Sequence, residues 1–204
     1  MLNKRRNMAQ DDLATPQRLN AFSDGVFAVI ITIMVFLLKP PQEPTFSELW
    51  KLWPTALSYG LSYLFVAIAW VNHHYLLRHA NHATVPLIWS NFAQLFSVSL
   101  VPFSTAWIAQ TRLAPVPVFI YATIFLLVNI TYLILVWEAL CTEQSSGITM
   151  KTMRIMNVRS FFTIGLFIIA MICAFKFPYC SLGLIWCALL FYLRPAPPEI
   201  RIKI

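Results

Sequence analysis

The sequence predicts an all-α membrane protein, a single domain of six transmembrane helices that takes up residues 1–204. Hydrophobic residues make up 59% of the chain and charged residues only 11%. The apolar residues gather in six stretches, each long enough or nearly long enough to cross about 30 Å of hydrocarbon as a helix. The stretches lack the alternation of membrane β-strands, which leaves helices as the spanning structure. The expected spans are residues 22–38, 54–77, 87–110, 115–141, 158–175 and 179–193.

Local signals mark the ends of several spans. The first span is followed by Pro40 and Pro41, and proline cannot continue a helix. In the connection of residues 39–53, Ser47 is the expected cap of the next helix, while Trp50 suits the membrane interface. The fifth and sixth spans are separated only by residues 176–178, which predicts a tight hairpin.

Lysine and arginine are distributed unevenly among the predicted loops. If the N-terminus is cytoplasmic, the basic residues outside are Lys39, Lys51, Arg112 and Lys176. Those inside are Lys4, Arg5, Arg6, Arg18, Arg78, Lys151, Arg154, Arg159, Arg194, Arg201 and Lys203. This bias follows the positive-inside rule and predicts that both termini are cytoplasmic. It also accounts for the net charge of +7, which therefore indicates contact with lipid headgroups and not with nucleic acid.

Polar side chains of the first three spans fall at one membrane level. A carboxylate costs about 2.5–3.5 kcal/mol at the bilayer centre, so Asp24 needs partners even near a helix end. The candidate partners at this level are Trp70, His73, His74 and Asn91. One interpretation is a structural clamp that joins three helices, because buried polar groups must be hydrogen-bonded. The other is a proton relay.

A metal centre and an enzyme are less consistent with these residues. Adjacent helical side chains point about 100° apart, so His73 and His74 do not easily bind one ion. The four cysteines form no Cys-x-x-Cys pair, and we interpret them as small buried hydrophobic residues. Ser23 is not flanked by the glycines of a nucleophile elbow. We therefore expect no metal, no cofactor and no catalytic activity.

A narrow stripe follows one side of the first span. Gly25, Val29, Thr32 and Phe36 are spaced i, i+4, i+7 and i+11, which places them on one face of a helix. Such a stripe can pack against another helix, because small residues allow close approach. It can also line a pore if several copies surround an axis. Val29 would then be an apolar constriction and Thr32 a hydroxyl that helps to coordinate a cation.

The polar level and the stripe together resemble the endolysosomal potassium channel family and its prokaryotic homologues. Three stretches carry the resemblance: Arg18-x-x-x-Phe22-Ser23-Asp24, Trp70-Val-Asn-His73-His74 and Leu95–Thr105. The resemblance is specific mainly over residues 18–110. It implies a potassium-permeable leak channel that is not gated by voltage. It also implies a homotetramer in the bacterial inner (plasma) membrane, with the first helix of each subunit lining the pore.

The resemblance also implies roles for individual residues. The pore constriction falls on Val29, the hydroxyl layer on Thr32 and a further apolar layer on Phe36. The structural motif and polar clamp comprise Arg18, Phe22, Ser23, Asp24, Trp70, His73, His74 and Asn91. Val29 is smaller than the residue expected there, so Ile30 or Ile33 replaces it as the constriction if the helix is rotated.

The sequence contains no Thr-Val-Gly-Tyr-Gly filter, and one ring of hydroxyls offers few oxygen dipoles to a passing ion. We therefore expect modest selectivity for K+, the permeant ion, over Na+. A proton-coupled secondary transporter that uses Asp24 with His73 or His74 remains the alternative.

Overall fold

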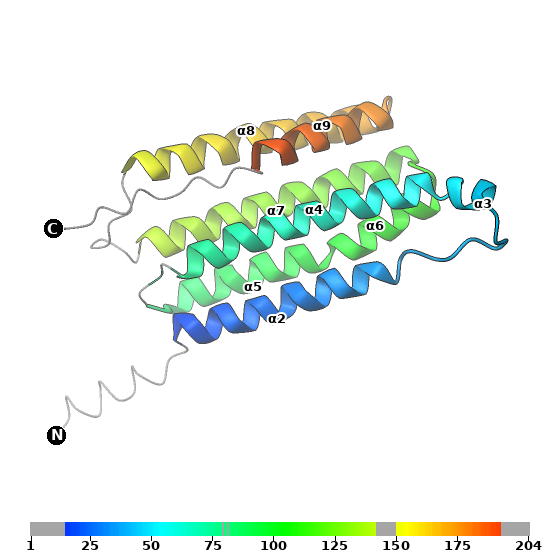
Figure 1. Ribbon diagram of the computed structural model, residues 1–204. Coiled ribbons are helices and arrows are strands. Elements are labelled where there is room, and N and C mark those ends of the chain that lie inside the picture. The colour runs from blue at the N-terminus through cyan, green and yellow to red at the C-terminus, as the bar shows by residue number, and fades with distance from the viewer. Residues whose placement is uncertain (1–14, 79, 81, 142–149, 193–204) are drawn as a thin grey trace, which may run out of the picture.

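The computed structural model describes residues 15–78, 80, 82–141 and 150–192, which form a bundle of helices lying side by side (Figure 1). The helices are α2 (Pro16–Val35), α3 (Phe46–Trp50), α4 (Trp53–Arg78), α5 (Val85–Ser99), α6 (Val101–Gln110), α7 (Pro115–Cys141), α8 (Met150–Ala174) and α9 (Pro178–Tyr192). The predicted cytoplasmic N-terminus, the loop residues 142–149 and the tail after residue 192 lie outside the described residues.

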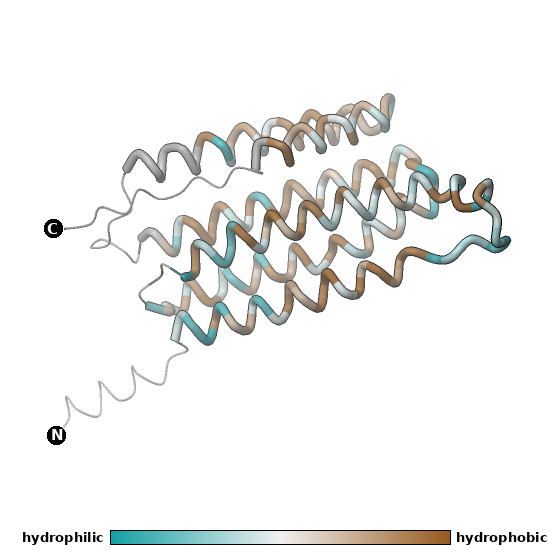
Figure 2. The backbone as a smooth tube through the Cα atoms, viewed as in Figure 1, coloured by the Kyte–Doolittle hydropathy of each residue, from teal (hydrophilic) through white to brown (hydrophobic). Residues whose placement is uncertain are grey.

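Four segments are long and apolar enough to cross a membrane: α2, α4, the pair α5–α6 and α7. The other two expected spans correspond to shorter apolar stretches of α8 and α9, Val158–Ala174 and Pro178–Leu190. Figure 2 shows apolar residues along most of each helix. The described residues are therefore helical and membrane-like, as expected, while six full crossings stay a prediction.

Helix α2 begins before the predicted residue 22 and ends before the predicted residue 38. The Thr15 side chain caps the helix by accepting a hydrogen bond from the Arg18 backbone N–H at 3.4 Å. Pro16 follows as the first helical residue, where its fixed backbone angle suits a helix start. At the other end, Phe36 is the capping residue, and the amides of Leu37 and Leu38 bond to carbonyls three residues back.

The third expected span is not one unbroken helix. Helix α5 ends at Ser99 and α6 begins at Val101, with Leu100 between them. Pro102 explains the break, because proline has no N–H to offer the carbonyl of Val98 and its ring clashes with that carbonyl. The expected span over residues 87–110 is thus present as Val85–Gln110, with an interruption at Leu100 that the sequence did not predict.

The connection after α2 contains the short helix α3, which the sequence did not predict. Thr45 caps it by accepting a hydrogen bond from the Glu48 N–H at 3.3 Å. Ser47, the expected cap, lies inside this helix instead. The cap falls on the other hydroxyl residue because Thr45, unlike Ser47, has an extended backbone.

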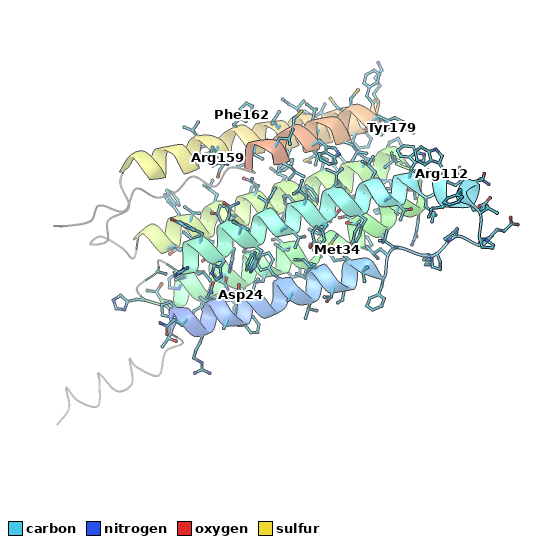
Figure 3. All side chains as sticks on the ribbon, in the orientation of Figure 1. Asp24, Met34, Arg112, Arg159, Phe162 and Tyr179 are labelled. Atoms are coloured by element: carbon cyan, nitrogen blue, oxygen red, sulfur yellow. The ribbon has the colours of Figure 1, made fainter. Side chains whose placement is uncertain are left out.

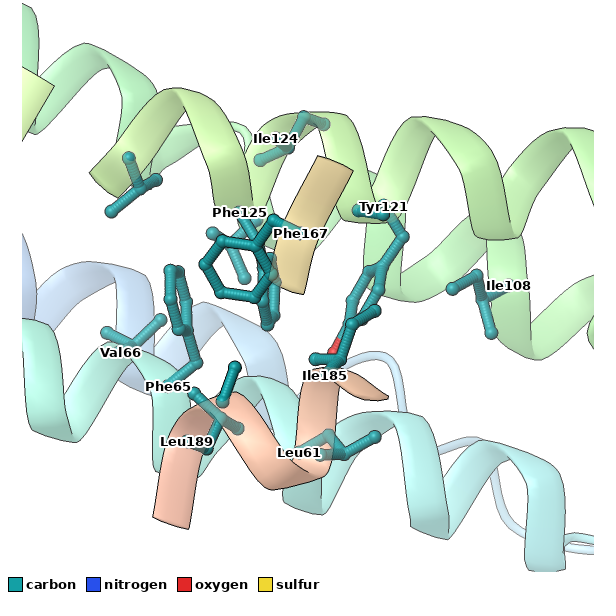
Figure 4. Close-up of a cluster of buried hydrophobic side chains, with 14 of the residues drawn as sticks. Leu61, Phe65, Val66, Ile108, Tyr121, Ile124, Phe125, Phe167, Ile185 and Leu189 are labelled. Carbon is teal, nitrogen blue, oxygen red and sulfur yellow. The ribbon is translucent and has the colours of Figure 1, made fainter. Parts of the chain in front are cut away.

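Helix α2 lies at one edge of the bundle. It packs against α4 and α5, while α8 and α9 pack on the far side against α7 (Figure 1). The core between them is aromatic: Phe65 stacks on Phe125 with centroids 3.7 Å apart, and Phe167 meets both rings edge-on (Figure 4). Because α2 has neighbours on one side only, its opposite face remains uncovered within the subunit.

Candidate functional site

The two faces of α2 differ sharply. The buried face consists of Leu19, Ser23, Phe27, Ile30 and Met34. Their spacing of three or four residues makes one continuous side of a helix. Figure 3 shows Asp24 near the start of this helix and Met34 near its end. The polar residues of α2 that bind other helices therefore sit at one end of the bundle, and the rest of the buried face is mostly apolar.

The first polar group, which we call the serine network, consists of Ser23, His73 and Asn91, all fully buried. The Ser23 hydroxyl bonds to the Leu19 carbonyl at 2.9 Å, and the Asn91 amide donates to the Ser23 oxygen at 3.1 Å. The Asn91 carbonyl oxygen lies 2.6 Å from Nε2 of His73. Because that oxygen can only accept, His73 carries a proton on Nε2. The network thus joins α2, α4 and α5.

The second group, the aspartate network, consists of Asn20, Asp24, Trp70 and His74. The Trp70 Nε1–H donates to Oδ1 of Asp24 at 2.8 Å, and the Asn20 amide donates to Oδ2 at 3.2 Å. Nδ1 of His74 lies 3.4 Å from Asp24 and 3.2 Å from the Asn20 amide. The Asp24 and His74 side chains are about one-third exposed, at 34% and 35%, so this network reaches the surface of the subunit.

The two histidines therefore belong to different networks. Of the expected partners of Asp24, the structure brings Trp70 and His74 to the carboxylate. His73 and Asn91 instead contact each other, with Asn91 also binding Ser23. Sequence reasoning missed Asn20, although its position four residues before Asp24 places both on one helix face. Ser23 meets Asn91 and not a histidine, which gives it no general base.

The remaining motif residues point outward. Phe22 is 52% exposed and meets Phe92 of α5 edge-on, with centroids 5.6 Å apart. The Arg18 side chain is exposed, and its backbone N–H bonds to Thr15. Their part in an anchor stays a prediction.

The stripe also lies on the uncovered face of α2. Val29 is 55% and Phe36 78% exposed, and Gly25 and Thr32 are exposed as well. The Thr32 hydroxyl bonds to the carbonyls of Ala28 and Val29 in its own helix, at 3.0 and 2.9 Å. We call Gly25, Val29, Thr32 and Phe36 the outward stripe.

The two substitutes considered for Val29 lie on different sides of α2. Ile33 is 47% exposed beside the stripe, whereas Ile30 is 5% exposed and packs in the core. The Ile30 side chain therefore faces the interior of its own subunit and not the uncovered face, and the identity of the constriction stays a prediction.

The possible metal ligands and the cysteines can be located in the described part of the chain. No group of three His, Cys, Asp or Glu side chains lies close enough there to hold a metal ion. Cys173 is half-buried, and Cys180 and Cys187 are exposed. The expectation of buried cysteines is thus wrong for these two, which face outward from α9.

Comparisons with known proteins show the family of the chain. The family model for the endosomal/lysosomal potassium channel TMEM175 matches residues 18–102, which include both polar networks and the outward stripe. A potassium channel of Chryseobacterium sp. (strain P1-3) is 33% identical over 89% of this chain and 94% of its own length. The human endosomal/lysosomal proton channel TMEM175 is 20% identical over 67% of this chain and 28% of its own length.

A solved structure has the same fold. The crystal structure of a lysosomal potassium-selective channel TMEM175 homolog from Chamaesiphon minutus superposes with a TM-score of 0.77. It is 30% identical and covers 87% of this chain and 95% of its own. The fold and the relatives together place the chain among multi-span helical proteins of an ion-channel family. The chain belongs to the TMEM175 family, and its relatives from Chryseobacterium and Chamaesiphon minutus are named potassium channels.

Proposed function

We propose that the chain forms a leak-type cation channel in which copies of α2 surround the pore. The observation that carries the proposal is the outward stripe. Helix α2, at the edge of the bundle, exposes the apolar side chain of Val29, the hydroxyl of Thr32 and the ring of Phe36. They lie on a face that its own subunit leaves uncovered. Four copies around an axis would bury these faces against a shared channel.

In this channel Val29 is the constriction and Thr32 supplies the hydroxyl ring, with Phe36 as the next apolar layer. A ring of valine side chains restricts passage by excluding water. The Thr32 proton already bonds within its own helix, which leaves lone pairs of the oxygen for a cation. One such ring provides few oxygen ligands, so K+ is preferred over Na+ only modestly.

The two polar networks then act as the anchor of the pore helix. They join α2 to α4 and α5 through side-chain hydrogen bonds (Ser23–Asn91 and Trp70–Asp24). Hydrogen bonds on one face of α2 fix how the helix is turned about its own long axis. That orientation decides which of its side chains face the axis of the pore. The anchor role therefore supports the assignment of Val29 and not Ile30 as the constriction.

The test is ion flux from liposomes that contain the purified protein. Val29→Ala should raise the K+ flux by widening the constriction, and Thr32→Val should reduce the preference for K+ over Na+. Ile172→Ala on α8 is the control for Val29→Ala, because it shortens an aliphatic side chain far from α2. Thr123→Val on α7 is the control for Thr32→Val, because it removes a hydroxyl far from α2. Both controls should leave the flux unchanged. Equal effects of stripe and control variants would refute the pore role of α2.

One observation keeps a proton-coupled carrier as a second candidate. Asp24 and His74 are close and partly exposed, and a hollow of about 740 Å³ between α2 and the end of α4 includes Asn20, Asp24 and Arg78 in its lining. The carboxylate is therefore accessible from outside its own subunit. Passive K+ flux that ignores an imposed pH gradient favours the channel, whereas flux that requires proton exchange favours the carrier.

A further inference from the structure

A second hollow lies at the other end of the bundle, away from the polar networks. It has a volume of about 480 Å³ and is formed by the end of α3, the start of α4, the turn after α6 and the start of α9. This volume is within the range of small-molecule sites. Figure 3 shows Arg112 and Tyr179 beside α3 at this end. Segments distant in the sequence thus meet at one place.

The hollow combines aromatic rings with positive charge. Its lining includes Trp50, Trp53 and Tyr179, together with Lys51 and Arg112. None of the residues that line it is acidic, although Glu48 pairs with Lys51 from the side. Tryptophan and tyrosine favour the level of the lipid headgroups, and arginine presents a planar fork of donors that fits phosphate oxygens.

The backbone holds Arg112 in an unusual position. The Leu113 amide bonds to the Ile108 carbonyl at 3.2 Å and closes the C-terminal end of α6. Arg112 has φ 47° and the following Leu113, 3% exposed, has φ 67°. Glycine is the usual residue at the first of these positions, because a side chain is strained there. The buried Leu113 anchors the turn, and the Arg112 side chain stays exposed at the hollow.

We propose that this hollow binds the phosphate headgroup of an anionic membrane phospholipid. The Arg112 guanidinium contacts the phosphate and supplies the uncompensated positive charge, Lys51, which is paired with Glu48, adds an N–H donor, and the three aromatic side chains border the headgroup and the upper acyl chains. Charge complementarity selects an anionic over a zwitterionic lipid. The surrounding aromatic rings indicate a phosphate that arrives on a lipid and not free in water. The site does not depend on the proposed ion pathway.

Native mass spectrometry of the detergent-purified full chain tests the proposal. The protein is titrated with phosphatidylglycerol and, separately, with phosphatidylcholine of the same acyl chains. Arg112→Gly removes the guanidinium at a backbone position that glycine accepts, so folding is retained. Its apparent Kd for phosphatidylglycerol should rise about tenfold, as expected for the loss of a charge-assisted hydrogen bond. Its weak binding of phosphatidylcholine should not change.

Lys39→Gln is the matched control, because it removes an exposed cation from the loop after α2 without touching the hollow. It should bind phosphatidylglycerol as the unmodified chain does. The proposal is overturned if Arg112→Gly binds phosphatidylglycerol normally, if both variants lose it equally, or if the two lipids bind alike. Inorganic phosphate that binds at Arg112 and displaces no lipid would overturn the assignment to a membrane lipid.

Discussion

At the scale of single residues, Asn91 holds the centre of the serine network. One side-chain amide serves two partners: its nitrogen donates to Ser23 and its oxygen meets His73. All three side chains are fully buried. Inside a membrane protein a lost partner is not replaced by water, so the stability of this junction depends on the amide itself.

Asn91→Ala should therefore destabilise the subunit by about 1–2 kcal/mol, because the buried His73 imidazole loses its partner and the Ser23 oxygen loses its donor, although the Ser23 hydroxyl keeps its bond to the Leu19 carbonyl. Thermal unfolding of the detergent-purified protein measures the change as a lower Tm. Ser99→Ala is the control: Ser99 is exposed and bonds only to the Phe96 carbonyl of its own helix. An unchanged Tm for Asn91→Ala would argue against the network as an anchor.

Asp24→Asn separates the anchor from a proton-carrying role. The amide oxygen of asparagine can still accept from Trp70, so we expect a loss of only about 1 kcal/mol from the weaker, uncharged hydrogen bond. In the channel, K+ flux per assembled protein should persist within about twofold, which corresponds to less than 1 kcal/mol. Loss of flux in a well-assembled variant would instead favour the carrier.

At the scale of elements, the helix ends place the functional side chains. Thr15 caps α2 directly before the turns that carry Asn20, Ser23 and Asp24. If the first turn frays, these side chains lose their fixed positions relative to α4 and α5. The start of α2 is thus part of the proposed anchor, although the side-chain bond of Thr15 goes to the Arg18 backbone and not to either polar network.

Thr15→Ala should loosen the first turn of α2, because it removes a cap that contributes about 1 kcal/mol. Hydrogen exchange followed by mass spectrometry should show about fivefold faster exchange in the peptide that contains Arg18. Thr15→Ser keeps the hydroxyl and should behave as the unmodified chain does. Identical exchange in all three proteins would mean that the cap contributes nothing measurable.

The turn after α6 gives a second element-scale prediction. Because Arg112 has a left-handed backbone, its substitution by glycine relieves strain of about 1 kcal/mol, partly offset by the greater freedom of the unfolded chain. A β-branched residue is worse there. We expect Arg112→Gly to have the highest Tm, the unmodified chain an intermediate Tm and Arg112→Val the lowest. The reverse order would contradict the strained cap.

At the scale of the whole molecule, the uncovered face of α2 cannot be explained from one subunit alone. The helix has neighbours on its buried side only, and the outward stripe faces away from them. Assembly around a symmetry axis would cover this face with copies of itself. Lipid is the other possible cover, and in that case the stripe has no role in permeation.

Electron microscopy of purified particles distinguishes these arrangements. We expect four-fold symmetry with α2 nearest the axis, because a ring of four would bring four Val29 side chains together. Particles with α2 on the periphery would exclude the stripe from the pore, whatever their symmetry. Two-fold symmetry would contradict the proposed ring of four Thr32 hydroxyls.

By itself the sequence determined the all-helical, membrane-like class, the approximate positions of the long apolar helices and the residues that share a face. Period and hydropathy are local properties, so Val29, Thr32 and Phe36 fall on one side of a helix whatever surrounds it. The Thr-Pro start of α2 and Pro102 also carried signals that fix helix boundaries. The family resemblance of residues 18–110 was visible in the same local motifs.

Only the tertiary structure decided how the helices rotate against each other. That rotation brings His74 to Asp24 and His73 to Asn91, buries Ile30 while exposing Ile33, and admits Asn20 to the aspartate network. The physical reason is that the helical period of about 3.6 residues determines only which side chains of a helix share a face. Which neighbour they meet depends on packing across the whole bundle.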